Sequence, residues 1–444
     1  MVEMRGKIKN VKKLATTPAR KLALEIAEAG LQAIDTEQTV RSRISMSSDA
    51  LAIGDRSFAL GGFDRLFVVG VGKCALEAGR ALEGVLGDRL TGGIILTIGV
   101  PAPFKIKNSK LEIRFGTHPF PTEANVDATS DIIRLLSSLT EKDFVIFVIS
   151  GGGSTLLCQP FDAAQGRSLK CEDEGNILKV LFEKGATIQE INTVRKHLSF
   201  ARGGHLAAYA YPATSVALIF SDVPGDNLEF VASGPTVKDV TTVDEARMII
   251  TKYDLEKSTG LKIEPLKTPK EDRYFEKIEN ILFVSNATAL SAMKARAETA
   301  GFKAEIATAT LEGEAREVGK KIAGDIAASP DKIMRLYGGE TTVTVKRSGR
   351  GGRNEELVLG VLEKIEKGTL VLSFDSDGHD NQGGYAGALC DIITKEKAEK
   401  LDQSAEKFLE ENDSAGFFEK VGDYVETGDT GSNVSDLVIA LKYE

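Results

Sequence analysis

The sequence predicts an α/β fold built on a mainly parallel sheet, and three observations support this prediction. Short runs rich in β-branched residues alternate with longer amphipathic stretches, which is typical of strands and helices in parallel sheets. Four glycine-rich loops directly follow apolar runs, as expected where strands pass into helices. The chain has 444 residues and is 42% hydrophobic, and single cores rarely exceed about 300 residues, so we predict two domains.

The N-terminal half contains the alternating elements of a first α/β domain. Thr17 and Pro18 predict the start of a helix that ends near Ile34, because threonine caps helices and proline is tolerated in the first turn. A polar stretch at 162–175 predicts a surface loop. The other predicted strands are 65–70, 93–98, 143–149 and 215–220, and the other helices are 75–86, 123–139, 173–183 and 188–198.

A candidate linker separates this half from the rest of the chain. Residues 257–272 contain two prolines, several lysines and little periodicity. We therefore predict an N-terminal domain at 1–260, which can take in part of 280–330, a linker at 261–279 and a C-terminal domain at 280–444. The predicted strands beyond the linker are 280–284, 332–336, 341–345 and 369–373, and the helices are 287–300 and 355–366.

Composition excludes several classes of function. A net charge of -9 and a pI near 5.3, without a dense Lys/Arg block, argue against nucleic acid or an anionic membrane as the main partner. The chain contains no run of 18 apolar residues and its basic start lacks the apolar stretch of a signal peptide, so we expect a cytoplasmic protein. The four cysteines form no CxxC pair, which predicts buried thiols and neither a zinc site nor disulfides.

The densest glycine-rich loop is Ser150-Gly151-Gly152-Gly153-Ser154, directly after the apolar run 143–149. Without a Cβ, glycine lets successive N–H groups point at one anion, and the start of a following helix adds partial positive charge. The loop therefore predicts a phosphate- or nucleotide-binding site. A tight strand-to-helix turn without a ligand is the alternative interpretation.

A second loop, Gly70-Val71-Gly72-Lys73, fits neither of two common phosphate-binding fingerprints. The Walker pattern requires GxxxxGK[ST], and Cys74 follows Lys73 here. The Rossmann pattern GxGxxG lacks its third glycine, because Ala75 occupies that position. Lys73 nevertheless lies where a strand meets a helix, so it is a candidate to bind phosphate or carboxylate; the alternative is a solvated lysine.

Acidic residues dominate two further loops. Asp222 and Asp226 follow the predicted strand 215–220, and Asp375 and Asp377 follow the strand 369–373. Carboxylates at such positions hold Mg²⁺ or act as a general base, whereas turn formation is the alternative role. We predict Mg²⁺ at Asp375 and Asp377 and take Asp222 as the base, with Asp226 or Asp377 as alternatives.

Glycines and arginines mark the region between these acidic loops. Gly338, Gly339 and Glu340 form one segment, which we include in the cofactor-binding set, and Arg350 and Arg353 flank two glycines at the start of a helix. Guanidinium groups bind carboxylate and phosphate bidentately. Arg353 stands where the helix dipole disfavours a cation unless an anion is present, which predicts an anion-binding role.

Taken together, these segments resemble the type II, or MOFRL, glycerate kinases over nearly the whole chain. The resemblance implies ATP- and Mg²⁺-dependent phosphorylation of D-glycerate, with 2-phosphoglycerate as the expected product. It also implies a large Rossmann-like α/β/α N-terminal domain, a smaller C-terminal α/β domain with its MOFRL-type region at about 332–442, and an active site in the cleft. The segments that carry it are 69–73, 117–121, 150–154, 194–199 with 203–204, 221–226, 232–236, 338–342, 351–355, 375–378 and 430–434.

We hypothesise that Arg353, helped by Lys73, holds the glycerate carboxylate, while amides of Gly151 to Ser154 hold ATP phosphates and Asp375 or Asp377 holds Mg²⁺. A homodimer is a further expectation. An NAD(P)H-dependent hydroxypyruvate reductase and a non-catalytic phosphometabolite sensor are the alternatives. The 2- or 3-phosphate product, the preferred nucleotide and metal, the general base and the oligomeric state stay open.

Three segments depart from the family pattern. The tract Ala163 to Leu169 looks like a surface insertion, and Asp429 stands where the family usually has proline. His379-Asp380-Asn381 replaces a run richer in glycine and proline. A change in this last segment can alter metal affinity or pH dependence.

Overall fold

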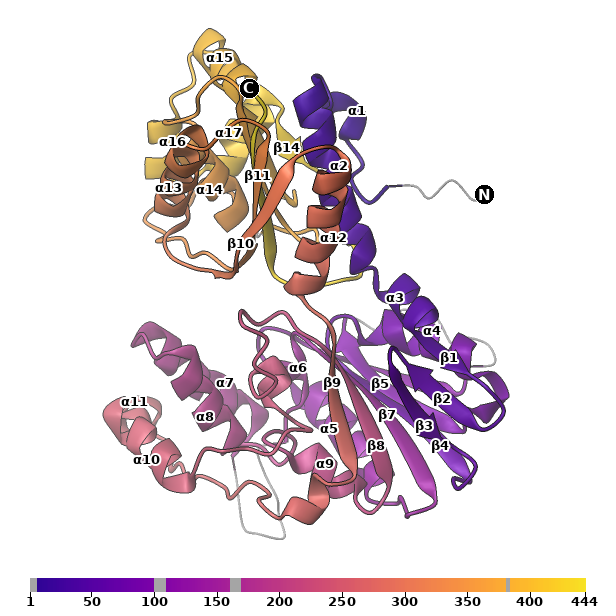
Figure 1. The fold of residues 1–444 in the computed structure, drawn as a ribbon. Helices are drawn as coiled ribbons and strands as arrows, with labels where there is room; N and C mark the ends of the chain where they lie inside the picture. The colour runs from indigo at the N-terminus through magenta and orange to yellow at the C-terminus, as the bar shows by residue number, and fades with distance from the viewer. Residues whose placement is uncertain (1–5, 100–108, 160–168, 381–383) are drawn as a thin grey trace. The chain divides into compact units, whose positions relative to one another are not determined.

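The structure, a computed structural model, describes residues 6–99, 109–159, 169–380 and 384–444. Most of the tract Ala163 to Leu169, and Asn381, therefore lie outside the described residues. The described chain divides into two compact units (Figure 1). The parallel-sheet unit comprises Thr36–Ser221 and Asp226–Phe283, and the mixed-sheet unit comprises the N-terminal residues through Asp35, Asp222–Gly225 and Val284–Glu444.

The parallel-sheet unit contains a six-stranded sheet of order β6-β5-β4-β7-β8-β9. Its strands from β6 to β8 are mutually parallel, which confirms the predicted fold class. The order runs outward in both directions from β4 and β7, so these neighbours form a topological switch point, where ligands of open α/β sheets bind. The strands are β4 (Arg65–Val71), β5 (Gly92–Ile98), β6 (Leu111–Gly116), β7 (Asp143–Ser150), β8 (Thr214–Phe220) and β9 (Ile278–Val284).

A small antiparallel sheet and a set of helices complete this unit. The small sheet has the order β1-β2-β3, and its strands are β1 (Ile44–Met46), β2 (Ala50–Ile53) and β3 (Arg56–Ala59). The α-helices are α3 (Thr36–Arg43), α4 (Ala75–Leu86), α5 (Glu123–Leu136), α6 (Gly153–Leu156), α7 (Cys171–Glu183), α8 (Ile188–Lys196), α9 (His205–Ala210), α10 (Val243–Lys252) and α11 (Leu255–Thr259). Short 3₁₀ turns lie at Gly87–Arg89, Val231–Ser233 and Asp272–Tyr274.

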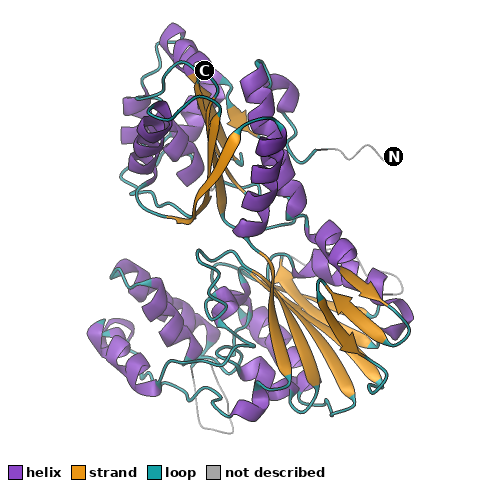
Figure 2. Ribbon diagram, in the orientation of Figure 1, coloured by secondary structure: helices purple, strands orange, loops and turns teal. Residues whose placement is uncertain are grey.

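The mixed-sheet unit contains a sheet of order β10-β11-β15-β12-β13-β14, in which only the β10–β11 pair is parallel. Helices α2 and α12 cover one face, and α13, α14 and α17 cover the other (Figure 2). The strands are β10 (Lys303–Leu311), β11 (Ile333–Gly339), β12 (Thr369–Asp375), β13 (Gly387–Asp391), β14 (Tyr424–Val425) and β15 (Asp436–Lys442). The helices are α1 (Val11–Leu14), α2 (Pro18–Ala33), α12 (Asn286–Thr299), α13 (Ala315–Ala327), α14 (Arg353–Val361), α15 (Ile392–Lys400), α16 (Ala405–Glu410) and α17 (Ser414–Val421).

Helix α2 joins the N-terminus to the C-terminal part of the chain. Thr17 caps it by accepting a hydrogen bond from the Arg20 amide, as predicted. The Arg20 side chain is fully buried and forms ion pairs with Asp391 at 2.6 Å and Asp423 at 2.9 Å. The predicted N-terminal domain at 1–260 included α2, but α2 packs within the mixed-sheet unit.

The predicted linker at 261–279 is an ordered segment of the parallel-sheet unit. Ile263 and Leu266 are buried, and the Leu266 amide donates to the carbonyl of His197 at 2.7 Å. Thr268 donates to Asp239 at 2.8 Å. Prolines and lysines here belong to a packed coil, which explains why composition alone suggested a linker.

Other local predictions have mixed outcomes. The predicted helix at 75–86 and the predicted strands that begin at Arg65 and Asp143 are confirmed. The strand predicted at 341–345 is wrong, because only Thr342 forms a single bridge, to Glu314. All four cysteines are free and buried, as predicted. Among the described residues, no helix is both long and apolar enough to cross a membrane.

We expect Arg20→Met to lower the free energy of unfolding by about 3–5 kcal/mol, because it leaves Asp391 and Asp423 buried without their shared cation. Urea denaturation of the full chain measures the loss. Arg296→Met is the matched control, because Arg296 on α12 pairs with Glu25 on α2 at a partly exposed position. Its free energy of unfolding should fall by less than about 1 kcal/mol. Equal losses in the two variants would contradict the importance of the buried pair.

Candidate functional site

The carboxyl ends of β4 and β7 meet in a first candidate site, within the parallel-sheet unit. Gly72 has a φ of +124°, and a Cβ there would lie 2.1 Å from Ser150 Oγ. Ser150 Oγ donates to the carbonyl of Val71 at 3.4 Å and accepts from the amide of Cys74 at 3.2 Å. Close backbone approach therefore explains Gly72, and the Ser150 hydroxyl, predicted to bind cofactor, holds the turn together.

Positive charge gathers beside Gly152. A Cβ on Gly152 would lie 3.4 Å from Cγ of Lys73 and 3.8 Å from Cδ2 of His118. Desolvation, together with the charges of Lys73 and Arg195, lowers the pKa of His118. Desolvation and the charge of Arg202 also lower the pKa of Arg195, to about 10. The charges of Lys73 and Arg195 therefore make this end of the sheet favourable for an anion.

Backbone donors lie beside these cations. Helix α6 begins at Gly153, and in the described part of the chain no acceptor is recorded for the amides of Gly152, Gly153 or Ser154. Gly153 packs so closely on the next loop that a Cβ would lie 2.6 Å from Cβ of Ala232. The structure thus brings Lys73 and the loop from Ser150 to Ser154 together, whereas the identity of their ligand stays a prediction.

Strand topology builds a second, acidic site at one edge of the mixed sheet. Strand β15 lies between β11 and β12 and is antiparallel to both. Its first residue, Asp436, is therefore paired with the last residue of each neighbour, Gly339 and Asp375. Glu340 follows β11 directly, so three carboxylates share this edge of the sheet.

Arg353, the first residue of α14, forms ion pairs with all three carboxylates. Its distances are 2.6 Å to Glu340, 3.0 Å to Asp375 and 2.6 Å to Asp436. Burial raises the pKa of Asp375, as does the nearby charge of Asp436, while Arg353 opposes this rise. One guanidinium cannot neutralise three carboxylates, so the edge keeps a surplus of negative charge that suits a cation.

The loop that carries Asp375 and Asp377 suits Mg²⁺, which needs few protein ligands, better than it suits a metal ion that is coordinated entirely by protein. The amide of Asp377 donates to Asp375 at 2.9 Å, and Asp377 accepts from the amide of His379 at 2.9 Å. Within the described ranges, no group of three His, Cys, Asp or Glu residues is placed to hold a metal. Mg²⁺ commonly takes one or two carboxylates and completes its shell with water and phosphate oxygens, and Asp375 and Asp377 fit that use.

Two further acids lie beneath the acidic edge. Asp380 is buried and accepts from the amides of Asn354 at 3.1 Å and Glu355 at 2.7 Å, at the start of α14. Burial raises the pKa of Asp380 to about 7, and burial with the charge of Asp380 raises that of Glu355 to about 9. Glu355 therefore keeps its proton at neutral pH, which limits the negative charge below the site.

Asp222, the predicted base, is held by residues that precede β15. Asn433 Nδ2 donates to Asp222 Oδ2 at 3.1 Å, and the Ser435 hydroxyl donates to the Asp222 carbonyl. Asp222 therefore belongs to the mixed-sheet unit, with Arg353, Asp375 and Asp377. The sequence-based prediction missed Asn433 as a site residue, although the motif 430–434 contains it.

Packing explains other glycines of the predicted site. Gly339 has a φ of +147°, and a Cβ there would lie 2.2 Å from the Leu311 amide nitrogen. A Cβ on Gly338 would lie 3.0 Å from the Asn286 side chain. Cofactor binding by these two glycines and by Glu340 stays a prediction. Arg350 pairs bidentately with Glu419 on the surface, at 2.7 and 3.0 Å, and is not part of the acidic edge.

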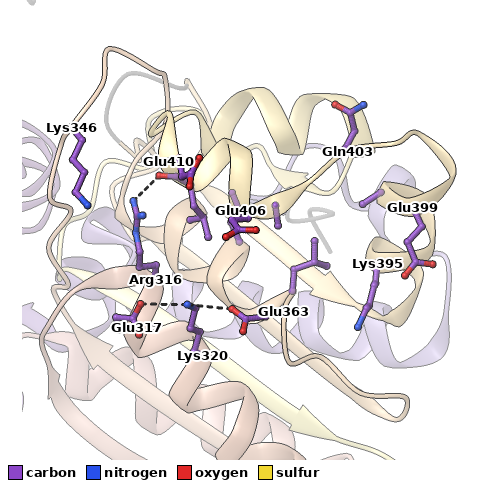
Figure 3. Close-up of a pocket in the computed structure, with 15 residues that line it drawn as sticks. Arg316, Glu317, Lys320, Lys346, Glu363, Lys395, Glu399, Gln403, Glu406 and Glu410 are labelled. Carbon is purple, nitrogen blue, oxygen red and sulfur yellow. Dashed lines mark hydrogen bonds and ion pairs between the residues drawn. The ribbon is translucent and has the colours of Figure 1, made fainter.

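A cavity of about 790 Å³ lies elsewhere in the mixed-sheet unit, among α13, α14, α15 and α16 (Figure 3). Lys320 in its wall pairs with Glu317 at 3.5 Å and Glu363 at 3.2 Å. Arg316, also in the wall, pairs with Glu356 at 2.7 Å. None of the sequence-predicted site residues lines this cavity, and these two cations are already neutralised, so it is not the candidate site.

We expect Gly72→Ala to lower the free energy of unfolding by about 3 kcal/mol or more, because it combines a disfavoured φ with a clash against Ser150. The matched control is Gly260→Ala, since Gly260 has a φ of +71° but open space around its added Cβ. This control should cost about 1 kcal/mol. Urea denaturation of both variants compares the losses, and equal values would show that φ alone requires glycine at position 72.

Comparison with known proteins places this geometry in a family. The model of a domain of unknown function (DUF4147) matches residues 22–265, and the MOFRL family model matches residues 333–436. A glycerate 2-kinase of Pyrococcus horikoshii is 34% identical over 441 residues, which cover 95% of this chain and 97% of that protein. An Agrobacterium vitis protein with hydroxypyruvate reductase in its name is 38% identical over 392 residues, covering 84% and 86%.

A solved structure agrees with these sequence comparisons. The crystal structure of a glycerate kinase from Thermotoga maritima superposes with a TM-score of 0.81 at 31% identity, covering 95% of this chain and 99% of that one. The resemblance predicted from the motifs is thereby confirmed. The chain belongs to the glycerate kinase family that combines a DUF4147 domain with a MOFRL domain.

Proposed function

We propose that this protein phosphorylates D-glycerate with ATP and Mg²⁺, releasing ADP and 2-phosphoglycerate. The similarity to a glycerate 2-kinase over 97% of that protein's length is the observation that carries the proposal. Phosphoryl transfer requires positioning of oxyanions and neutralisation of charge more than covalent chemistry. The cationic loop of the parallel-sheet unit supplies groups that bind oxyanions. The acidic edge of the mixed-sheet unit supplies carboxylates that suit Mg²⁺, and Mg²⁺ neutralises phosphate charge.

The loop at Gly152 to Ser154 binds a substrate oxyanion in this proposal. Its amides have no acceptor among the described residues, and Lys73 adds a positive charge beside them. Ser150 acts differently from the sequence-based expectation, because its hydroxyl is engaged with Val71 and Cys74. Its role is to fix the turn that carries Lys73.

Asp375 and Asp377 hold Mg²⁺ in this proposal, and the ion neutralises phosphate charge when it is bound. Arg353 then has a different role from the predicted glycerate clamp. Its guanidinium already contacts Glu340, Asp375 and Asp436, which fixes the orientation of these carboxylates and limits their repulsion. Arg353 is thus a positioning residue for the acidic edge.

Asp222 is the proposed base for the glycerate hydroxyl. The side-chain amide of Asn433 orients this carboxylate by donating to Oδ2. The hydroxyl proton passes to Asp222 as the hydroxyl oxygen bonds to phosphorus and the bond to the leaving ADP breaks.

Phosphorus NMR of the protein with ATP, Mg²⁺ and D-glycerate tests the reaction directly. We expect ADP and a new phosphomonoester resonance, split into a doublet by the single proton of C2. A triplet would mean phosphorylation at C3 instead. The Agrobacterium relative motivates a parallel assay with NADH and hydroxypyruvate, followed by absorbance. NADH oxidation with intact ATP would contradict the kinase and support a reductase, and no reaction in either assay would support a sensor.

We expect Asp377→Asn to raise the Mg²⁺ concentration required for half-maximal activity about tenfold, a change of about 1.4 kcal/mol, because one anionic ligand is lost. Initial rates over a Mg²⁺ titration at saturating ATP give this value. Asp325→Asn removes the same charge at an exposed position on α13 and is the control. An unchanged Mg²⁺ requirement in Asp377→Asn would remove Asp377 from the metal site.

A further inference from the structure

Helix α8 presents one face to the glycine-rich loop. Asn192 and Arg195 lie three residues apart on this helix, so their side chains share a face. Asn192 Oδ1 accepts from Ser233 Oγ at 2.8 Å, and Ser233 Oγ lies 2.9 Å from Ser154 Oγ. These hydrogen bonds from Asn192 through Ser233 to Ser154 place the face of α8 that carries Arg195 against the start of α6.

Arg195 has no counter-ion among the residues that the structure describes. Its side chain forms no hydrogen bond or ion pair there, and its Nε is buried without an acceptor. The nearby carboxylate of Glu174 pairs instead with Arg202, at 2.6 Å, and both of those side chains are buried. A partly buried guanidinium without an acceptor is costly unless a ligand supplies one.

The backbone around Arg195 is held in place by its neighbours. Lys196 is buried and pairs with Glu229 at 2.9 Å and Asp239 at 3.1 Å. Arg202 Nη1 donates to the carbonyl of Arg195 at 3.4 Å. The backbone that carries the guanidinium is therefore held before a ligand arrives, which reduces the ordering cost of binding.

We infer that Arg195 binds an oxyanion of a substrate at the loop formed by Gly152 to Ser154, beside Lys73. A guanidinium binds carboxylate and phosphate oxygens in the same bidentate manner, so the anion is the nucleotide phosphate or the glycerate carboxylate. Only the identity of this anion rests on the proposed function. The site itself rests on the contacts of α8 with the loop and on the missing counter-ion.

Inorganic phosphate is the direct probe of this site. Its dissociation constant is measured from the rise in melting temperature of the full chain during a phosphate titration. We expect Arg195→Met to weaken phosphate binding about 10- to 100-fold, and Arg195→Lys to weaken it less, because lysine keeps the charge but loses the planar fork. Arg134→Met is the control, because Arg134 is exposed on α5 of the same unit. The Arg134→Met variant should bind phosphate as tightly as the unmodified protein.

Steady-state kinetics then identify the anion. A raised KM for ATP alone assigns Arg195 to the nucleotide, and a raised KM for glycerate alone assigns it to the acceptor. Unchanged phosphate affinity in Arg195→Met would overturn the inference, as would a lack of any phosphate effect on the unmodified protein. If Arg195→Met does not fold, unchanged phosphate affinity and unchanged KM values in Arg195→Lys overturn it. Arg195-dependent phosphate binding without kinase activity would refute the proposed function alone.

Discussion

The acidic edge of the mixed sheet depends on one charge balance, centred on Arg353. Strand β15 runs antiparallel between β11 and β12, so its first residue meets the last residues of both neighbours. Carboxylates from three segments therefore crowd together, and two of them, on Asp375 and Asp436, are nearly buried. Arg353 reduces the repulsion between these carboxylates but does not neutralise their whole charge. The remaining negative charge is a cost that makes sense where a cation binds.

Glycine-rich loops have two physical explanations, and both apply in this protein. Gly72 and Gly339 are required because other backbone or side-chain atoms occupy the place of a Cβ. Gly152, in contrast, adopts a left-handed conformation beside Lys73 and His118, where the loop amides lack acceptors in the described structure. A sequence pattern shows that a loop needs glycine, but only the structure shows whether close packing or backbone conformation is the reason.

Local periodicity allowed much of the fold to be predicted. The helix at 75–86 and the strand beginning at Asp143 follow directly from patterns within a few residues. The unit to which α2 belongs was not predictable, because Arg20 meets its carboxylates on elements far along the chain. The same reason hid Asn433, which contacts the distant Asp222, and Asp436, whose role depends on its strand neighbours. Residues 341–345 have the composition of a strand but lack a neighbouring strand to pair with along their length.

The N-terminal helix has a consequence for synthesis on the ribosome. The buried Arg20 of helix α2 pairs with Asp391 and Asp423, which are made 371 and 403 residues later. All residues of the parallel-sheet unit, through Phe283, emerge before these partners exist. Helix α2 therefore stays without these partners during synthesis, whereas the parallel-sheet unit is made in full and can fold before the mixed-sheet unit is complete.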